Sequence, residues 1–215
     1  MNDLFDDDPN VPRLLPLGAQ ALLLRGFALE QAGELLRCID QVAQQAPWRH
    51  MATPGGKAMS VAMTGCGPLC WVSDHRGYRY AERDPLSGQP WPAMPAALAQ
   101  LAQAAAQQAG FADFTPDACL VNRYAPGARM SLHQDRDERD LTAPIVSVSL
   151  GLPAIFLWGG GTRSAPAQRV PLRHGDVVVW GGVDRLRYHG VLPVAPGEHP
   201  ATGDCRINLT LRKAR

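Results

Sequence analysis

Residues 204–212 read DCRINLTLR, a strict alternation of polar and apolar side chains that predicts a β-strand. Successive side chains of a strand point to opposite faces, so the polar ones share a face. That face is expected to carry Arg206, Asn208, Thr210 and Arg212. Two arginines inside a barrel require anionic partners, and a dicarboxylate such as 2-oxoglutarate would satisfy both. The alternative is an edge strand whose arginines lie in water.

The rest of the C-terminal half also has the pattern of short strands separated by turns that contain Gly, Pro or Asp. Predicted strands cover residues 118–124, 145–150, 154–158, 169–172, 176–180 and 186–191. Seven or eight such strands indicate a sandwich, a jelly roll or a barrel. Asn122 and Tyr124 share a face of the first strand and could offer neutral hydrogen bonds to the same ligand.

The N-terminal half divides into helices and an aromatic-rich segment. Apolar residues at helical spacing predict a helix over 29–43, and an Ala-rich second helix is expected over 95–110. Between them, residues 48–92 combine Trp, Tyr and Met with many Gly and Pro, which suits a mobile binding surface. A peripheral hairpin layer whose aromatic side chains simply pack is the alternative.

These patterns predict a mainly β, α+β chain in three parts. Residues 1–47 form an N-terminal extension with an amphipathic helix, 48–92 a recognition segment, and 93–215 the strand-rich core. Residues 1–12 are expected to be a frayed acidic lead-in.

Composition narrows the functional classes. The formal net charge is +1, so the chain lacks the overall basic character that drives nonspecific duplex binding. Five cysteines without a C-x-x-C motif argue against a disulfide framework or a structural zinc site, and reduced thiols in the cytoplasm are expected. The acidic N-terminus does not resemble a signal peptide, and no apolar run is long enough to span a membrane.

The candidate metal ligands are two histidines and one aspartate. His133 and Asp135 are two residues apart, so on a strand both would face one point. His189 follows the apolar strand 177–180 and is preferred as third ligand over His174, which precedes a strand at a turn. Two imidazoles and one carboxylate leave positions open on the metal, which suits Fe(II) and O₂ better than structural zinc.

Taken together, these motifs resemble those of the AlkB family of Fe(II)/2-oxoglutarate dioxygenases. The likeness rests on H-x-D, the distal histidine, R-x5-R and NRY-x-PG at 122–127. Residues 143–156 and 174–182 continue it, and residues 53–56 and 59–64 resemble the family's nucleotide-recognition lid. The resemblance implies a double-stranded β-helix (jelly roll) with flanking helices and an N-terminal lid.

The resemblance also implies an activity and its cofactors. The family uses Fe(II), O₂ and 2-oxoglutarate to dealkylate damaged bases, releasing succinate and an aldehyde. His133, Asp135 and His189 are implied as iron ligands. The 2-oxoglutarate contacts implied are Arg206 and Tyr124 at the distal carboxylate, Arg212 and Asn122 at the keto-acid end, and Asn208 nearby.

For the substrate, alkylated single-stranded DNA or RNA, the resemblance assigns a second set of residues. Trp71 matches the aromatic that stacks on the flipped base. Asp137 matches the acid at its exocyclic amino group, where a carboxylate favours a cationic methylated base. Other implied nucleotide or lid positions are Thr53, Met59, Met63, Tyr78, Ser131 and Arg163. Lys57 replaces an aromatic lid position and residues 159–164 are more Gly-rich than the family pattern.

Two other functions remain open at this point. A single-strand-binding jelly roll with a vestigial metal site would need none of the intact metal and arginine residues. A related dioxygenase acting on a protein or small molecule would not need the aromatic lid or Asp137. Because all of these residues are present, a dealkylase is the expectation. We also expect it to be a monomer in the cytoplasm.

Overall fold

The arginine-bearing strand lies in the interior of a large antiparallel sheet. The computed structural model describes residues 13–215, so the predicted lead-in 1–12 lies outside the described residues. Strand β14 (Arg206–Arg212) pairs with β9 (Ile145–Gly151) on one side and β7 (Ala118–Tyr124) on the other. The edge-strand alternative for this stretch is therefore wrong.

The large sheet has eight strands in the order β1-β2-β12-β9-β14-β7-β4-β3. Their bounds are β1 Leu14–Gly18, β2 Ala21–Leu24, β12 Val177–Trp180, β9 Ile145–Gly151, β7 Ala118–Tyr124, β4 Ala58–Cys66 and β3 Arg49–Ala52. Neighbours far apart in the sequence are hydrogen-bonded here, for example β2 with β12. The sheet thus joins both halves of the chain.

A smaller sheet faces the large one. It has the order β11-β10-β13-β8. Its strands are β8 Met130–His133, β10 Ala154–Trp158, β11 Gln168–Leu172 and β13 His189–Val191. Buried side chains of the two sheets, among them Phe156 from β10 and Trp180 from β12, form one apolar cluster between them. Two facing antiparallel sheets of this kind form the jelly roll that the sequence predicted.

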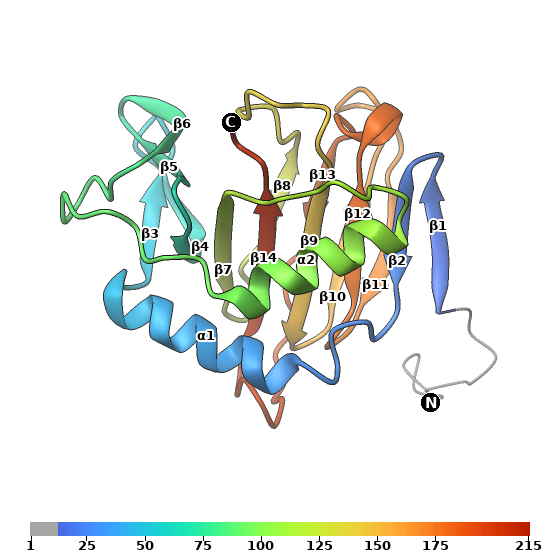
Figure 1. Cartoon of the computed structure of the whole chain (residues 1–215), viewed down its shortest axis with the longest axis horizontal. Coiled ribbons are helices and arrows are strands. Elements are labelled where there is room, and N and C mark those ends of the chain that lie inside the picture. The colour runs from blue at the N-terminus through green and yellow to red at the C-terminus, as the bar shows by residue number, and fades with distance from the viewer. Residues whose placement is uncertain (1–12) are drawn as a thin grey trace.

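Two helices cover the outer face of the large sheet, as Figure 1 shows. They are α1 (Ala32–Gln45) and α2 (Ala96–Gln108). Leu35 and Ile39 of α1 and Leu101 of α2 pack in one cluster with Ile207 and Leu209 of β14. The apolar face of β14 therefore packs under the helices, which leaves its polar face for the space between the sheets.

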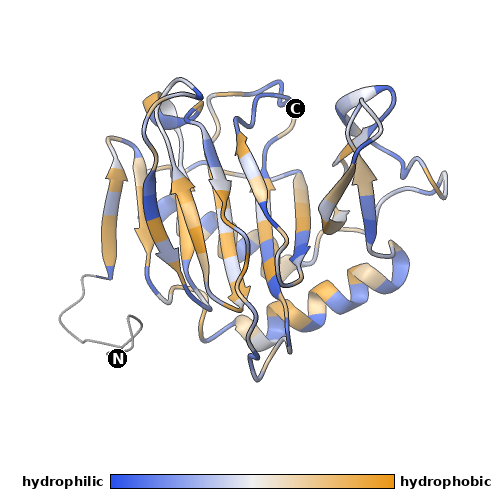
Figure 2. Ribbon diagram, turned by 180° about the vertical axis from the view of Figure 1, so that it is seen from behind, coloured by the Kyte–Doolittle hydropathy of each residue, from blue (hydrophilic) through white to orange (hydrophobic). Residues whose placement is uncertain are grey.

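The segment 48–92 contributes to two different structures. Strands β3 and β4 extend the edge of the large sheet, whereas β5 (Cys70–Asp74) and β6 (Gly77–Ala81) pair only with each other. This hairpin stands at the side of the molecule beside β3 and β4, which is visible from both sides (Figures 1 and 2). It carries Trp71 and Tyr78.

Some predicted boundaries are wrong. Strand β8 ends at His133, so Asp135 lies in the following loop and not on a strand. Strand β13 begins at His189 and not at residue 186, because the 3₁₀ turn η1 (Gly182–Asp184) continues until Arg187 donates its N–H to the carbonyl of Asp184 at 3.1 Å. The first helix begins three residues later than predicted, after a turn closed by Leu29 N–H and the Gly26 carbonyl.

Candidate metal and co-substrate site

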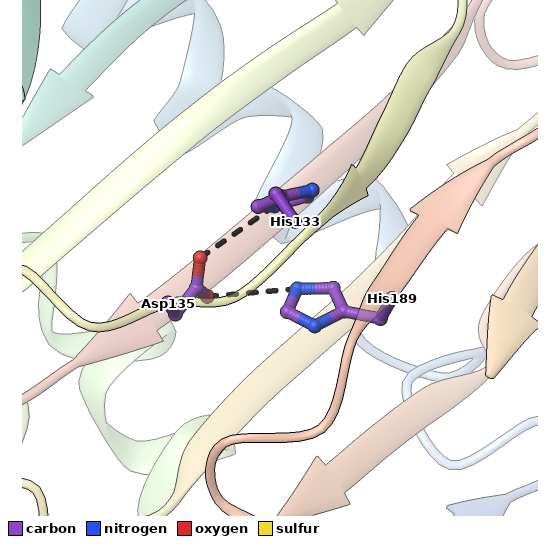
Figure 3. Close-up of side chains that lie close together, drawn as sticks. All are labelled: His133, Asp135 and His189. Carbon is purple, nitrogen blue, oxygen red and sulfur yellow. Dashed lines mark ion pairs between the residues drawn. The ribbon is translucent and has the colours of Figure 1, made fainter. Parts of the chain in front are cut away.

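The three predicted metal ligands converge between the sheets. One ligand atom from each of His133, Asp135 and His189 lies within 4.8 Å of the others. His133 Nε2 is 3.6 Å from Asp135 Oδ1, and His189 Nε2 is 3.8 Å from Asp135 Oδ2 (Figure 3). Among the described residues no other such group occurs. Although Asp135 is not on β8, the turn of the loop places its carboxylate against both rings.

Each imidazole is oriented by a main-chain carbonyl. His133 Nδ1 lies 2.8 Å from the Ser131 carbonyl and His189 Nδ1 lies 3.1 Å from that of Arg187. A carbonyl can only accept, so Nδ1 carries the proton and Nε2 keeps its lone pair toward Asp135. Burial, together with the neighbouring His133, lowers the pKa of His189 to about 4. His189 is therefore neutral and able to bind a metal at neutral pH.

The carboxylate of Asp135 is kept ionised by an arginine. Burial alone would raise its pKa, but the Arg212 guanidinium and the two imidazoles hold the pKa of Asp135 well below its usual range. Arg212 donates from Nε and Nη2 to Asp135 Oδ2 at 2.9 and 2.7 Å. Two neutral imidazoles and an anionic carboxylate form a donor set that fits Fe(II) and leaves further metal positions open.

Arg206 has the features of a binding site for an organic anion. Its side chain is 1% exposed and lies 5.0 Å above the ring of Tyr124. Its Nη2 donates to Ser149 Oγ at 3.0 Å, but within the described part of the chain Nε and Nη1 have no hydrogen-bond partner. A buried guanidinium with unused donors requires an anion, and a carboxylate of 2-oxoglutarate fits that need.

The two asparagines of this face differ in how fully they are used. The Asn208 amide group donates to Ser147 Oγ at 2.9 Å and to the Val148 carbonyl at 3.0 Å. Asn122 donates to Asn208 Oδ1 at 3.2 Å, while its own Oδ1 is buried with no partner among residues 13–215. Asn122 thus has an acceptor to offer a ligand, whereas Asn208 mainly cross-links β14 to β9.

A cavity of about 560 Å³ joins this region to the hairpin. All predicted metal and 2-oxoglutarate residues line it: His133, Asp135, His189, Asn122, Tyr124, Arg206, Asn208 and Arg212. All predicted substrate residues line it too: Thr53, Met59, Met63, Trp71, Tyr78, Ser131, Asp137 and Arg163. Residues separated by up to 159 positions in the chain therefore share one space.

The outer part of the cavity carries the aromatic side chains of the hairpin. The Trp71 and Tyr78 rings are stacked, with centroids 5.5 Å apart and planes 14° apart. Trp71 Nε1 donates to Asp137 Oδ2 at 2.8 Å, which connects the hairpin to the loop after β8. Tyr78 is 50% exposed, so this end of the cavity is open to solvent while the Arg206 end is closed.

Sequence reasoning missed a buried ionic network beside the metal ligands. Glu138 accepts from Tyr80 Oη at 2.6 Å and from Arg185 Nη2 at 3.0 Å, and lies 3.3 Å from Arg212 Nε. Only the three acidic residues within the segment 135–138 hinted at it. The rival ligand His174 accepts the N–H of Gly151 at 2.9 Å, and its ring lies 4.5 Å from the tilted ring of His199, away from the three metal ligands.

Comparison with known proteins agrees with this geometry. The sequence profile of the 2OG-Fe(II) oxygenase superfamily matches residues 20–212. The alpha-ketoglutarate-dependent dioxygenase AlkB of Escherichia coli (strain K12) is 58% identical over 214 residues, which is 100% of this chain and 98% of that protein. The tRNA demethylase abh1 of Schizosaccharomyces pombe is 32% identical and aligns with 68% of this chain and 53% of its own.

A solved structure shows the same fold. That of OsALKBH1 superposes with a TM-score of 0.81 at 28% identity, covering 93% of this chain and 99% of the other. With the profile spanning nearly the whole chain and the metal and anion sites in one cavity, this chain belongs to the 2OG-Fe(II) oxygenase superfamily.

Proposed function

We propose that this dioxygenase removes alkyl groups from damaged bases in single-stranded DNA or RNA. The observation that carries the proposal is the continuity of the cavity: the metal ligands and Arg206 lie at its buried end, and the stacked Trp71 and Tyr78 lie at its open end. A base that leaves its strand could stack on the hairpin and reach the metal without leaving the cavity.

The residues at the open end suit a methylated, cationic base. Trp71 offers an aromatic face, which binds any base by stacking. Asp137 brings a carboxylate to the same place, held there by the indole N–H at 2.8 Å. Methylation at position 1 of adenine or 3 of cytosine gives the base a positive charge, so the carboxylate favours the damaged base over the normal one.

At the buried end of the cavity, residues of the chain would hold the metal and orient 2-oxoglutarate. Iron bound by His133, Asp135 and His189, with O₂ and 2-oxoglutarate, would supply oxidation of the alkyl carbon, which is then lost as an aldehyde. Arg206 would bind the distal carboxylate of 2-oxoglutarate, assisted by the neighbouring Tyr124, and Asn122 and Arg212 would contact its keto-acid end.

The proposal is tested with a single-stranded oligonucleotide that carries one 1-methyladenine. After incubation with the chain, Fe(II) and 2-oxoglutarate, mass spectrometry should find an oligonucleotide lighter by one methylene group. The same strand without the methyl group is the control. Binding of the oligonucleotide without a mass change would favour the single-strand-binding alternative. Neither binding nor mass change would favour a dioxygenase acting on a protein or small molecule.

We further propose that the enzyme works as a monomer in the cytoplasm. All five cysteines are unpaired thiols, which suits a reducing compartment. No described helix has the length and apolar character needed to cross a membrane. Size-exclusion chromatography with light scattering tests the monomeric state.

A further inference from the structure

Arg185 is a buried arginine that contacts the loop carrying a metal ligand. It ends the turn η1 and is 2% exposed. Its Nη1 donates to the main-chain carbonyl of Asp135 at 2.6 Å and its Nε to that of Ala143 at 3.0 Å. Its Nη2 donates to Glu138 Oε2 at 3.0 Å. One guanidinium thus holds the loop 134–144 between β8 and β9 near its start, middle and end.

The contacts of Arg185 complement those of Arg212. Arg212 binds the carboxylate of Asp135, which orients the side chain. Arg185 binds the carbonyl of the same residue, which fixes the main chain from which that side chain projects. The loop has no ladder hydrogen bonds of its own, because β8 ends at His133 and β9 begins at Ile145. The Arg185 guanidinium therefore supplies the loop with hydrogen bonds that a neighbouring strand would otherwise supply.

The segment that carries Arg185 also orients a second ligand. The carbonyl of Arg187 accepts the Nδ1 proton of His189 at 3.1 Å. The carbonyl of Leu186 accepts from Gln134 Nε2 at 2.5 Å, a second link to the loop. Residues 185–187 consequently contact both the main chain of Asp135 and the ring of His189.

We propose that Arg185 is a positioning residue that sets the affinity of the His133, Asp135 and His189 site for a divalent metal. Its side chain does not line the cavity, so it acts through the Asp135 main chain. The proposal rests on the metal role of these three ligands but does not depend on which substrate is oxidised. Partners that orient metal ligands commonly change metal affinity about 10- to 100-fold when removed.

The variants are chosen to separate positioning from loss of the fold. Arg185→Met alone would leave the Glu138 carboxylate buried without one of its cationic partners, which destabilises a protein on its own account. The main variant is therefore Arg185→Met with Glu138→Gln, compared with Glu138→Gln alone. Arg185→Lys keeps the charge but cannot reach three acceptors. Arg25→Met is the matched control, because the Arg25 side chain likewise binds a main-chain carbonyl, that of Pro171, and a buried carboxylate, that of Asp176, and it does not contact the ligand loop.

The readout is Co(II) binding to the metal-free, full-length protein, followed by the visible absorption of the bound ion, with melting temperatures measured in parallel. The double variant should bind Co(II) about 10- to 100-fold more weakly than Glu138→Gln, with Arg185→Lys intermediate and Arg25→Met unchanged. Equal Co(II) affinity in Glu138→Gln and the folded double variant would overturn the proposal. An equal loss in Arg25→Met would also overturn it, because the loss of any buried arginine ion pair would then suffice.

If the double variant does not fold, the Co(II) affinity of Arg185→Lys decides: a parental value overturns the proposal and a weaker one supports it. No oligonucleotide enters the titration, so a failure of the dealkylation proposal leaves this result interpretable.

Discussion

Replacing Arg206 by methionine should weaken 2-oxoglutarate binding without destabilising the ligand-free protein. The guanidinium is 1% exposed, and its Nε and Nη1 have no partner within residues 13–215. Burial lowers the pKa of Arg206, which reflects the cost of keeping this charge without an anion. Truncating one partner of a buried, hydrogen-bonded charge pair costs about 2–5 kcal/mol, so affinity for 2-oxoglutarate should fall by about 30- to 4,000-fold.

The assay is a 2-oxoglutarate titration of succinate release at saturating Fe(II), with thermal melting of the metal-free protein. Arg206→Met should raise the half-saturation concentration while its melting temperature stays at or above that of the parent, because an unpaired buried charge is removed. Arg123→Ala is the matched control, since Arg123 lies on the neighbouring β7, opposite Ile207, is exposed and stacks on Trp48 outside the cavity. An unchanged half-saturation point would refute the assignment of Arg206 as the anion site.

Four further predictions concern the metal ligands and the open end of the cavity. His133→Ala or Asp135→Ala should abolish turnover, because iron would keep only two protein ligands, and near-normal rates at limiting Fe(II) would remove the assignment. Trp71→Ala should weaken binding of a methylated oligonucleotide about 5- to 150-fold in a fluorescence anisotropy titration, since one stacking contact contributes about 1–3 kcal/mol; Trp71→Phe, which keeps a ring but loses the indole N–H, should retain most of it. Asp137→Asn should weaken binding of a strand with cationic 1-methyladenine more than one with a neutral alkylated base, and an equal loss for both would contradict charge selection. The unfolding free energy of the metal-free protein should fall by up to about 3 kcal/mol as the pH is lowered from 6.5 to 4. In this range the unfolded state binds a proton at residue 189, whereas the folded state does not, because the folded pKa of His189 is about 4. Urea denaturation should show a smaller loss in His189→Gln, and identical pH profiles for the two proteins would contradict the lowered pKa.

The parts of the fold that the sequence predicted are those with a strong local pattern. In β14 the alternation correctly predicted the polar face, because Arg206, Asn208, Thr210 and Arg212 all line the cavity. The apolar runs at β9 and β12 were also predicted within about a residue of their observed bounds. In such strands burial on both faces decides the structure locally.

Other elements depend on partners far away in the chain. Strand β1 was not predicted, because its partly exposed residues acquire strand geometry only by pairing with β2. The hairpin of β5 and β6 has a mixed composition, and its register, with Trp71 opposite Tyr80 and Ser73 opposite Tyr78, is set by pairing between the two strands. Residue 186 was expected in a strand because Leu186 continues an apolar pattern, yet that side chain is exposed in a turn.

The candidate site likewise has one part that a local sequence pattern predicts and another that depends on distant partners. The metal ligands were recognisable from H-x-D and a distal histidine, and the structure brings all three together. The network of Glu138, Arg185 and Tyr80 was not, because it is formed by an irregular loop, a turn and a hairpin that have no common periodicity. Contacts of this kind follow from tertiary packing, so sequence pattern alone does not reveal them.

The measurement that tests the central claim most directly is the ratio of two products from one reaction. A single-stranded oligonucleotide with one 1-methyladenine is incubated with the chain, Fe(II) and limiting 2-oxoglutarate, and succinate and repaired base are quantified together. If the metal ligands, Arg206 and the stacking hairpin act in one coupled reaction within the cavity, succinate and repaired base should form in an equimolar ratio. Succinate that forms at the same rate with and without the methylated strand, and no repaired base, would contradict the account.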